Sequence, residues 1–181
     1  MRNRQRELLE LLDKSGAALY ALLTRLTLRE DVAEELMQEL FIKLSNSRGL
    51  DKVASWDAYA HRAAINLAFD WRRKRRRMRK KTSLSLDNVR EPASNDSSPL
   101  GKLIHTEELQ QTLNAIGRLN RAPREVLVMR YIQEESYDNI AEQLGKTPHQ
   151  VRALCSRAIN HLRSILGSNQ LPSSGKEACD V

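Results

Sequence analysis

Residues 136–162 read SYDNIAEQLGKTPHQVRALCSRAINHL, and this stretch decides the fold of the second half of the chain. A short helix is predicted from Ser136 to Leu144, and Gly145 is a typical residue to end it. A longer helix of matching apolar phase follows. A short helix, a turn that contains glycine and a longer helix are the layout of a helix-turn-helix, whose second helix lies in the major groove of DNA.

The second helix of this pair has a strong start signal. Thr147 is a good N-cap, Pro148 suits the first helical position, and Gln150 completes a capping box. Val151 and Leu154 lie on the apolar side. The candidate DNA-binding residues lie near the N-terminal end, where a recognition helix meets base edges and phosphates: Thr147, His149, Gln150, Arg152, Ala153, Ser156 and Arg157. A purely structural helix pair is the alternative explanation of the same pattern.

Helical periodicity extends over most of the remaining chain. It predicts one or two helices over 4–26 and further helices over 29–45, from Ser55 into a basic run, from Leu103 to Gly117, and near Pro123. Only 4% of the residues are aromatic, which also favours helices over sheets.

We therefore predict an all-α fold of two small helical domains joined by a flexible linker, the second of which contains the helix-turn-helix. The first domain is residues 1–81 and the second is residues 101–167. Between them, at 82–100, Ser, Pro and Asn accumulate and periodicity disappears, as is typical of a linker. The tail 168–181 is expected to be disordered.

The positive charge of the chain is concentrated in one place. There are 30 basic and 23 acidic residues, a net charge of +7. Residues 72–81, RRKRRRMRKK, contain nine basic residues and no acidic one, so the rest of the chain is slightly acidic. A run this dense repels itself and indicates a polyanionic partner, with a solvated helix end as the alternative.

Several functional classes are excluded. The glycines are isolated, which excludes phosphate-binding loops. The His and Cys residues lack zinc-site spacing and no nucleophile–base pair is visible, so we expect no metal, no cofactor, no catalytic residue and no enzymatic activity. No apolar stretch is long enough to span a membrane and the N-terminus is not a secretory signal. The two cysteines fit a reducing cytoplasm, which is the expected location.

Four segments, in order, resemble sigma-70-type initiation factors of the extracytoplasmic-function (ECF) class. VAEELMQELFIKL at 32–44 resembles their core-polymerase-binding helix, and SWDAYAHRAAINLAFDWRR at 55–73 resembles their promoter-melting and minus-10-reading segment. LNRAPREVLVMRY at 119–131 and SYDNIAEQLG at 136–145 resemble parts of their second DNA-binding domain. The resemblance covers about residues 5–166.

The resemblance implies a transcription initiation factor that binds core RNA polymerase, directs it to promoter DNA and assists promoter melting. The polymerase-binding residues would be Asp31, Glu34, Glu35, Gln38 and Glu39. Leu36 and Phe41 of the same helix are expected to be buried.

The minus-10 DNA-binding residues would be Trp56, Tyr59, Arg62, Asn66, Arg72, Arg73, Lys74, Arg75 and Arg76. Aromatic faces stack on unpaired bases, Asn66 would bond a flipped base, and the basic residues would hold phosphates. The alternative for Trp56 and Tyr59 is a place in the core. The helix-turn-helix residues would then read the minus-35 element.

The sequence departs from the family pattern in places. Trp56 and Tyr59 stand where the family usually has Phe and Trp, and Gln150, Leu154 and Ile159 replace frequent residues of the recognition helix. These departures concern which promoter sequence the protein recognises, and not whether it binds DNA. The family often has an anti-sigma factor, which makes one a candidate partner. The alternative function is a stand-alone helix-turn-helix regulator that binds DNA without polymerase. A DNA-processing enzyme with such a targeting domain would need a carboxylate cluster that the sequence lacks.

Overall fold

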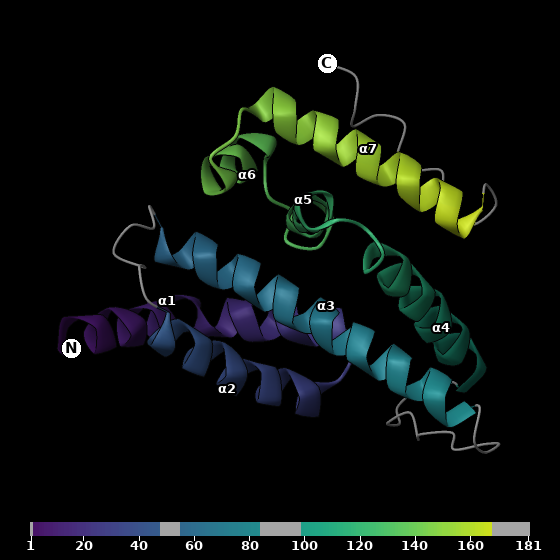
Figure 1. Cartoon of the computed structure of the whole chain (residues 1–181), viewed down its shortest axis with the longest axis horizontal. Helices are drawn as coiled ribbons and strands as arrows, with labels where there is room; N and C mark the ends of the chain where they lie inside the picture. The colour runs from purple at the N-terminus through teal and green to yellow at the C-terminus, as the bar shows by residue number, and fades with distance from the viewer. Residues whose placement is uncertain (1, 48–54, 84–98, 168–181) are drawn as a thin grey trace.

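The computed structural model describes residues 2–47, 55–83 and 99–167, and within these ranges the chain forms seven α-helices and no strand (Figure 1). The helices are α1 (Arg2–Thr27), α2 (Glu30–Asn46), α3 (Trp56–Ser83), α4 (Pro99–Ile116), α5 (Arg121–Tyr131), α6 (Tyr137–Leu144) and α7 (Pro148–Leu166). The predicted all-α fold is confirmed. Most of the predicted linker and the predicted disordered tail lie outside the described residues.

The first domain is a bundle of α1, α2 and α3, which all pack on one another. Side chains spaced three and four residues apart form the apolar stripe of each helix. The largest that are almost wholly buried are Leu19, Leu23, Leu26, Leu40, Leu44, Ile65 and Phe69. The sequence predicted one or two helices over 4–26, and the structure has a single continuous α1, in which the Ser15 hydroxyl donates a hydrogen bond to the Asp57 carboxylate of α3.

In the second domain α7 packs against α4, α5 and α6. The predicted capping box is present, because the Thr147 Oγ1 accepts from the Gln150 N–H at 3.2 Å and the Gln150 Oε1 accepts from the Thr147 N–H at 3.1 Å. Gly145 ends α6 in the left-handed conformation, at φ 61°, which glycine adopts without steric cost. Val151 and Ile140 are fully buried, so the apolar faces of α6 and α7 meet as predicted.

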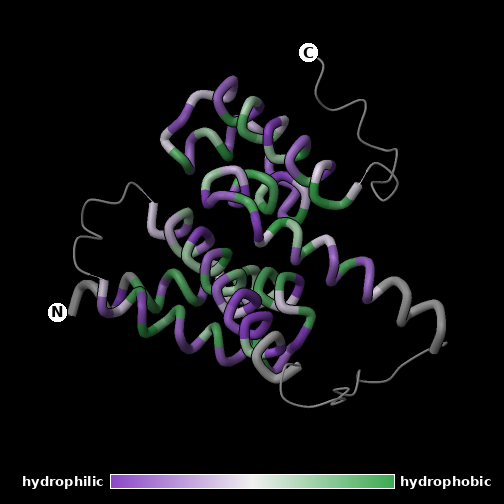
Figure 2. The backbone as a smooth tube through the Cα atoms, turned by 45° about the vertical axis from the view of Figure 1, so that its right-hand side comes forward, coloured by the Kyte–Doolittle hydropathy of each residue, from purple (hydrophilic) through white to green (hydrophobic). Residues whose placement is uncertain are grey.

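The two domains are in contact through α3. Helix α5 packs against α3, and hydrogen bonds join the C-terminal half of α3 to α4, which lies beside it (Figure 1). The same half of α3 carries the basic run and is strongly hydrophilic, whereas the neighbouring helices alternate between hydrophobic and hydrophilic segments (Figure 2). The side of α3 that carries most of the candidate minus-10 residues is therefore close to the second domain.

Candidate functional site

Helix α2 presents an acidic face to solvent. Its buried residues are Val32, Ala33, Leu36, Leu40 and Leu44. The five candidate polymerase-binding residues, Asp31, Glu34, Glu35, Gln38 and Glu39, are all exposed. The Arg29 guanidinium donates to the Asp31 carboxylate, from Nε to Oδ1 at 3.0 Å, and this hydrogen bond lowers the pKa of Asp31. The face is thus available to a basic partner surface.

The prediction that Phe41 is buried is wrong. Phe41 is 38% exposed and Ile42 is 57% exposed, whereas Leu36 is buried as predicted. The buried stripe of α2 follows Leu36 and Leu40 at a spacing of four residues and passes beside Phe41. Phe41 and Ile42 instead follow Gln38 by three and four residues, so they add apolar surface to the acidic face.

The aromatic residues at the start of α3 serve partly as core. Trp56 and Tyr59 are half-buried and pack against the apolar cluster. Arg62 is also half-buried, and its Nε donates to the Ala58 carbonyl at 3.2 Å. Tyr59, Arg62 and Asn66 line a groove of about 560 Å³ between α3 and the turn that joins α4 to α5. These three candidate minus-10 residues therefore share one surface.

Asn66 is the centre of a polar network between the domains. Its Nδ2 donates to the Glu125 Oε1 at 2.7 Å and to the Arg62 carbonyl at 2.7 Å. Its Oδ1 accepts from the Arg124 Nη2 at 2.8 Å. Glu125, which is 5% exposed, also accepts from the Arg121 Nε at 2.8 Å. Residues of α5 therefore bond one N–H and the oxygen of the Asn66 amide, and Arg62 of α3 bonds the other N–H.

Arg72 differs from its basic neighbours because it points inward. It is 7% exposed, and its Nη1 donates to the Leu26 carbonyl at 3.1 Å. Its Nη2 donates to the Gln110 Oε1 at 2.7 Å and to the Asn114 Oδ1 at 3.1 Å. Burial, together with the like charge of Arg75, lowers the pKa of Arg72 to about 10. Arg72 is still a cation at neutral pH, held by uncharged acceptors from both domains.

The other basic candidates of α3 lie at the surface. Arg73, Lys74 and Arg76 are exposed, and Arg73 pairs with Asp70 one turn earlier. Arg75 is half-buried, with its guanidinium 5.2 Å from the centre of the Trp71 ring. Apart from Arg72, the candidate basic residues of α3 therefore keep their side chains at least partly in solvent.

The candidate minus-35 residues gather at the first turns of α7. All are exposed except Ala153, which is half-buried: Thr147, His149, Gln150, Arg152, Ala153, Ser156 and Arg157. The Gln150 and Thr147 side chains are engaged in the capping box. The Arg152 guanidinium lies 5.5 Å from the centre of the Tyr137 ring, and the Arg157 Nε donates to the Ala153 carbonyl at 3.2 Å. The exposed side chains of His149 and Ser156 make no such contact with the described residues.

Further contacts between the domains were not predicted from the sequence. The Gln133 Nε2 lies 2.6 Å from the His61 Nδ1, and the Arg25 Nη1 donates to the Ile132 carbonyl at 2.9 Å. Burial lowers the pKa of His61, although the carboxylates of Asp57 and Glu135 act in the opposite direction. These residues hold the end of α5 against α1 and α3.

No group of three or more His, Cys, Asp or Glu residues is placed to hold a metal ion within the described ranges. Across those same ranges no helix combines the length and apolar character that crossing a membrane requires.

Both halves of the chain match known protein families. Sigma-70 region 2 matches residues 11–78, and Sigma-70, region 4 matches residues 109–162. The chain belongs to the sigma-70 family. The resemblance to the ECF class is confirmed as well, because a relative of that class aligns with most of the chain. The matched spans fall inside the predicted domains 1–81 and 101–167, whose limits stay predictions.

The relative is the ECF RNA polymerase sigma factor SigE of Mycolicibacterium smegmatis, which is 30% identical over 161 residues. The alignment covers 88% of this chain and 62% of SigE, so the chain spans about three-fifths of the length of this curated relative.

Two solved structures are also similar. CnrH, in complex with the cytosolic domain of CnrY, matches with a TM-score of 0.50 and 18% identity over 91% of this chain and 90% of CnrH, which shows the same fold. RpoE, in complex with the anti-sigma factor NepR from Bartonella quintana, matches with a TM-score of 0.45 and 24% identity over 92% of this chain and 98% of RpoE.

Proposed function

We propose that this protein is a transcription initiation factor that binds core RNA polymerase, directs it to promoters and assists promoter melting. One observation carries the proposal: region 2 and region 4 of the sigma-70 family follow one another in a single chain, with an acidic face on one helix and a helix-turn-helix at the other end. The protein would not itself be an enzyme, because the polymerase performs the chemistry. It would act in the cytoplasm.

The exposed face of α2 is the proposed docking surface for polymerase. Phe41 and Ile42, which are exposed although they are apolar, follow its acidic and amide side chains toward the C-terminal end of the helix. Protein interfaces combine apolar and charged side chains in this way, because the apolar part supplies binding energy and the charges supply specificity. A basic, partly apolar helical surface would be its complement.

The proposed DNA contacts divide between α3 and α7. Exposed basic residues of α3 would hold phosphates near the minus-10 element, where release of counterions makes binding strong and dependent on salt. Exposed residues of the first turns of α7 would meet base edges of the minus-35 element. A helix start that is fixed by the capping box at Thr147 would present them in a constant orientation.

The contact between α3 and α5 would have to open for minus-10 recognition. We name the observed state, in which Arg124 and Glu125 bond Asn66, the closed arrangement. Both N–H groups of the Asn66 amide are used in this state, one by Glu125 and one by the Arg62 carbonyl, so the amide has no free donor for a base. Binding to polymerase would therefore separate the domains and free Asn66. Following the family resemblance, we also propose an anti-sigma factor as a partner.

Reconstitution with core polymerase tests this function. Purified protein should bind core polymerase and direct run-off transcription from promoters selected from a genomic library. Glu39→Lys should weaken binding to polymerase at least tenfold, whereas Glu10→Lys on the exposed side of α1 is the matched charge reversal and should leave it intact. DNA binding without any association with polymerase would instead establish a stand-alone helix-turn-helix regulator.

A further inference from the structure

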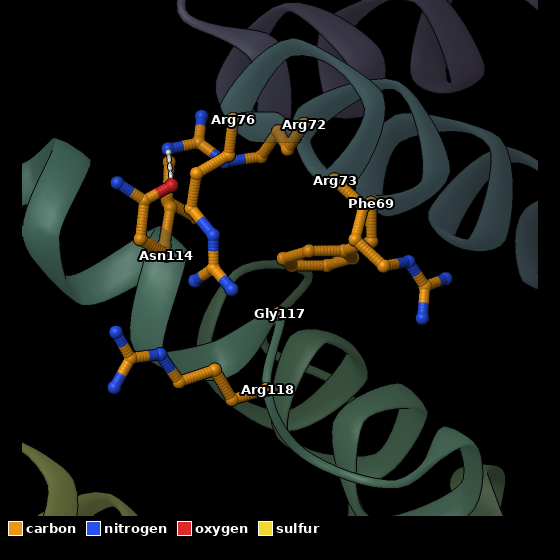
Figure 3. Close-up of a pocket in the computed structure, with 8 residues that line it drawn as sticks. Phe69, Arg72, Arg73, Arg76, Asn114, Gly117 and Arg118 are labelled. Carbon is orange, nitrogen blue, oxygen red and sulfur yellow. Dashed lines mark hydrogen bonds between the residues drawn. The ribbon is translucent and has the colours of Figure 1, made fainter. Parts of the chain in front are cut away.

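An arginine-lined cavity of about 280 Å³ lies between α3 and the turn that joins α4 to α5 (Figure 3). Arg72, Arg73 and Arg76 come from α3, and Arg118 comes from the turn. Phe69 contributes an apolar wall, with the guanidinium groups of Arg76 and Arg118 on one side of its ring and that of Arg73 on the other (Figure 3). No carboxylate is among the described residues that line the cavity.

Few acceptors or negative charges balance the guanidinium groups of these arginines. The Nε of Arg72 is buried and has no hydrogen-bond partner among the described residues, and the acceptors of its other nitrogens are all uncharged. The side chains of Arg76 and Arg118 make no hydrogen bond or ion pair to any residue that the structure describes. Arg73 alone has a carboxylate partner, Asp70, which lies outside the cavity lining.

The like charges of Arg72, Arg76 and Arg118 lie on the same side of the Phe69 ring (Figure 3), so they repel one another, and an anion that enters between them would relieve this repulsion. Guanidinium groups have a planar fork of donors that matches phosphate oxygens, and several of them together suit a ligand with adjacent phosphates. Burial of Arg72 strengthens such bonds, because water screens them less.

We propose that this cavity binds a small polyphosphate anion, either inorganic or the phosphate chain of a nucleotide. A DNA duplex is a poorer occupant, because Arg72 forms the inner wall at 7% exposure and α4 closes the opposite side. The ligand would bridge arginines of α3 to Arg118 of the second domain. If the proposed function holds, the bound anion would stabilise the closed arrangement and oppose promoter opening.

Calorimetric titration of the full chain with sodium tripolyphosphate tests the site. We expect saturable binding with one ligand per chain, and at least tenfold weaker affinity for sulfate at equal ionic strength. Arg118→Gln should weaken tripolyphosphate binding about tenfold or more, and Arg118→Lys should fall between it and the wild type. Arg163→Gln is the matched control, because Arg163 is an exposed arginine of α7 that does not line the cavity, and it should bind like the wild type.

Two results would overturn the site. Equal losses in Arg118→Gln and Arg163→Gln would show a general response to net charge. If promoter duplex displaces tripolyphosphate, and if Arg118→Gln lowers the affinity for the duplex as much as the affinity for tripolyphosphate, the arginines belong to the DNA-binding surface. Titration with a nucleoside triphosphate distinguishes an inorganic polyphosphate from a nucleotide. An affinity equal to that for tripolyphosphate shows that only the phosphate chain is recognised, and a higher affinity shows that the site binds a nucleotide. Polymerase is absent from these titrations, so failure of the proposed function would appear only in transcription.

Discussion

Replacing Glu125 by Ala should open the contact between the two domains. Glu125 accepts from the Asn66 Nδ2 at 2.7 Å and from the Arg121 Nε at 2.8 Å. A hydrogen bond to a charged acceptor contributes about 1.5–3 kcal/mol. The Arg121 side chain is 70% exposed, so its ion pair adds only about 0–1 kcal/mol and lies within the second domain. The closed arrangement should therefore lose about 2 kcal/mol, which is roughly a 30-fold change in its equilibrium constant.

Energy transfer between dyes on the two domains measures this equilibrium. Cysteines placed at Ser45 of α2 and Ser164 of α7, both exposed, accept the dyes, while Cys155 is buried and Cys179 is replaced by Ser. A protein that is about 95% closed would become about 40% closed after a 30-fold shift, so the transfer efficiency should change clearly.

The matched control is Glu142→Ala, which removes an exposed carboxylate from α6 and should leave the efficiency at the wild-type value. Glu125→Gln should be intermediate, because an amide oxygen still accepts a hydrogen bond but carries no charge. Circular dichroism checks that the helices remain folded. Unchanged transfer in folded Glu125→Ala protein would refute the reasoning, since Glu125 would then not hold the domains together.

Three further predictions address the proposed surfaces. Glu39→Lys should reduce affinity for core polymerase at least tenfold while duplex binding by the isolated protein persists; equal polymerase affinity in a titration would remove α2 as the docking surface. Arg77→Gln with Arg79→Gln should lower the log–log salt slope of promoter binding by about 0.9 for each lost phosphate contact, and an unchanged slope would make this part of the run a bystander. Arg152→Ala should cost about 1–3 kcal/mol at one minus-35 position in a promoter library, whereas Val151→Asp should unfold the second domain in thermal melts. A loss that is uniform over all bases would limit Arg152 to phosphate contact.

Features that depend only on residues close together in the sequence could be predicted from it. The start of α7 is an example, since Thr147, Pro148 and Gln150 satisfy the free N–H groups of the first turn without help from the rest of the chain. The apolar faces of α6 and α7 were predicted for the same reason. Phe41 was placed on the apolar stripe of α2 because it stands three residues before Leu44, but it lies at the edge of that stripe and is exposed.

Contacts between distant segments left no comparable pattern. Asn66 and Glu125 are 59 positions apart, and no local signal pairs them. In α5, Arg124 and Glu125 directly precede the apolar run 126–129, and the structure shows that both are buried. Buried charges need partners, so their presence alone indicates a contact with another polar group, although it does not identify Asn66.

The position of Arg72 follows from helical phase, and it allows this side chain either to join the two domains or to bind phosphate. The buried stripe of α3 passes through Ile65 and Phe69 and reaches Arg72 one turn later, so Arg72 faces inward while its basic neighbours face solvent. Its bond to the Leu26 carbonyl lies within the first domain and would survive opening. Its bonds to Gln110 and Asn114 belong to α4 and would not. Opening would therefore leave a guanidinium that is still anchored by α1 but has a free Nη2, ready to bind phosphate. The same nitrogen can hold the two domains together or hold DNA, but it cannot do both at once.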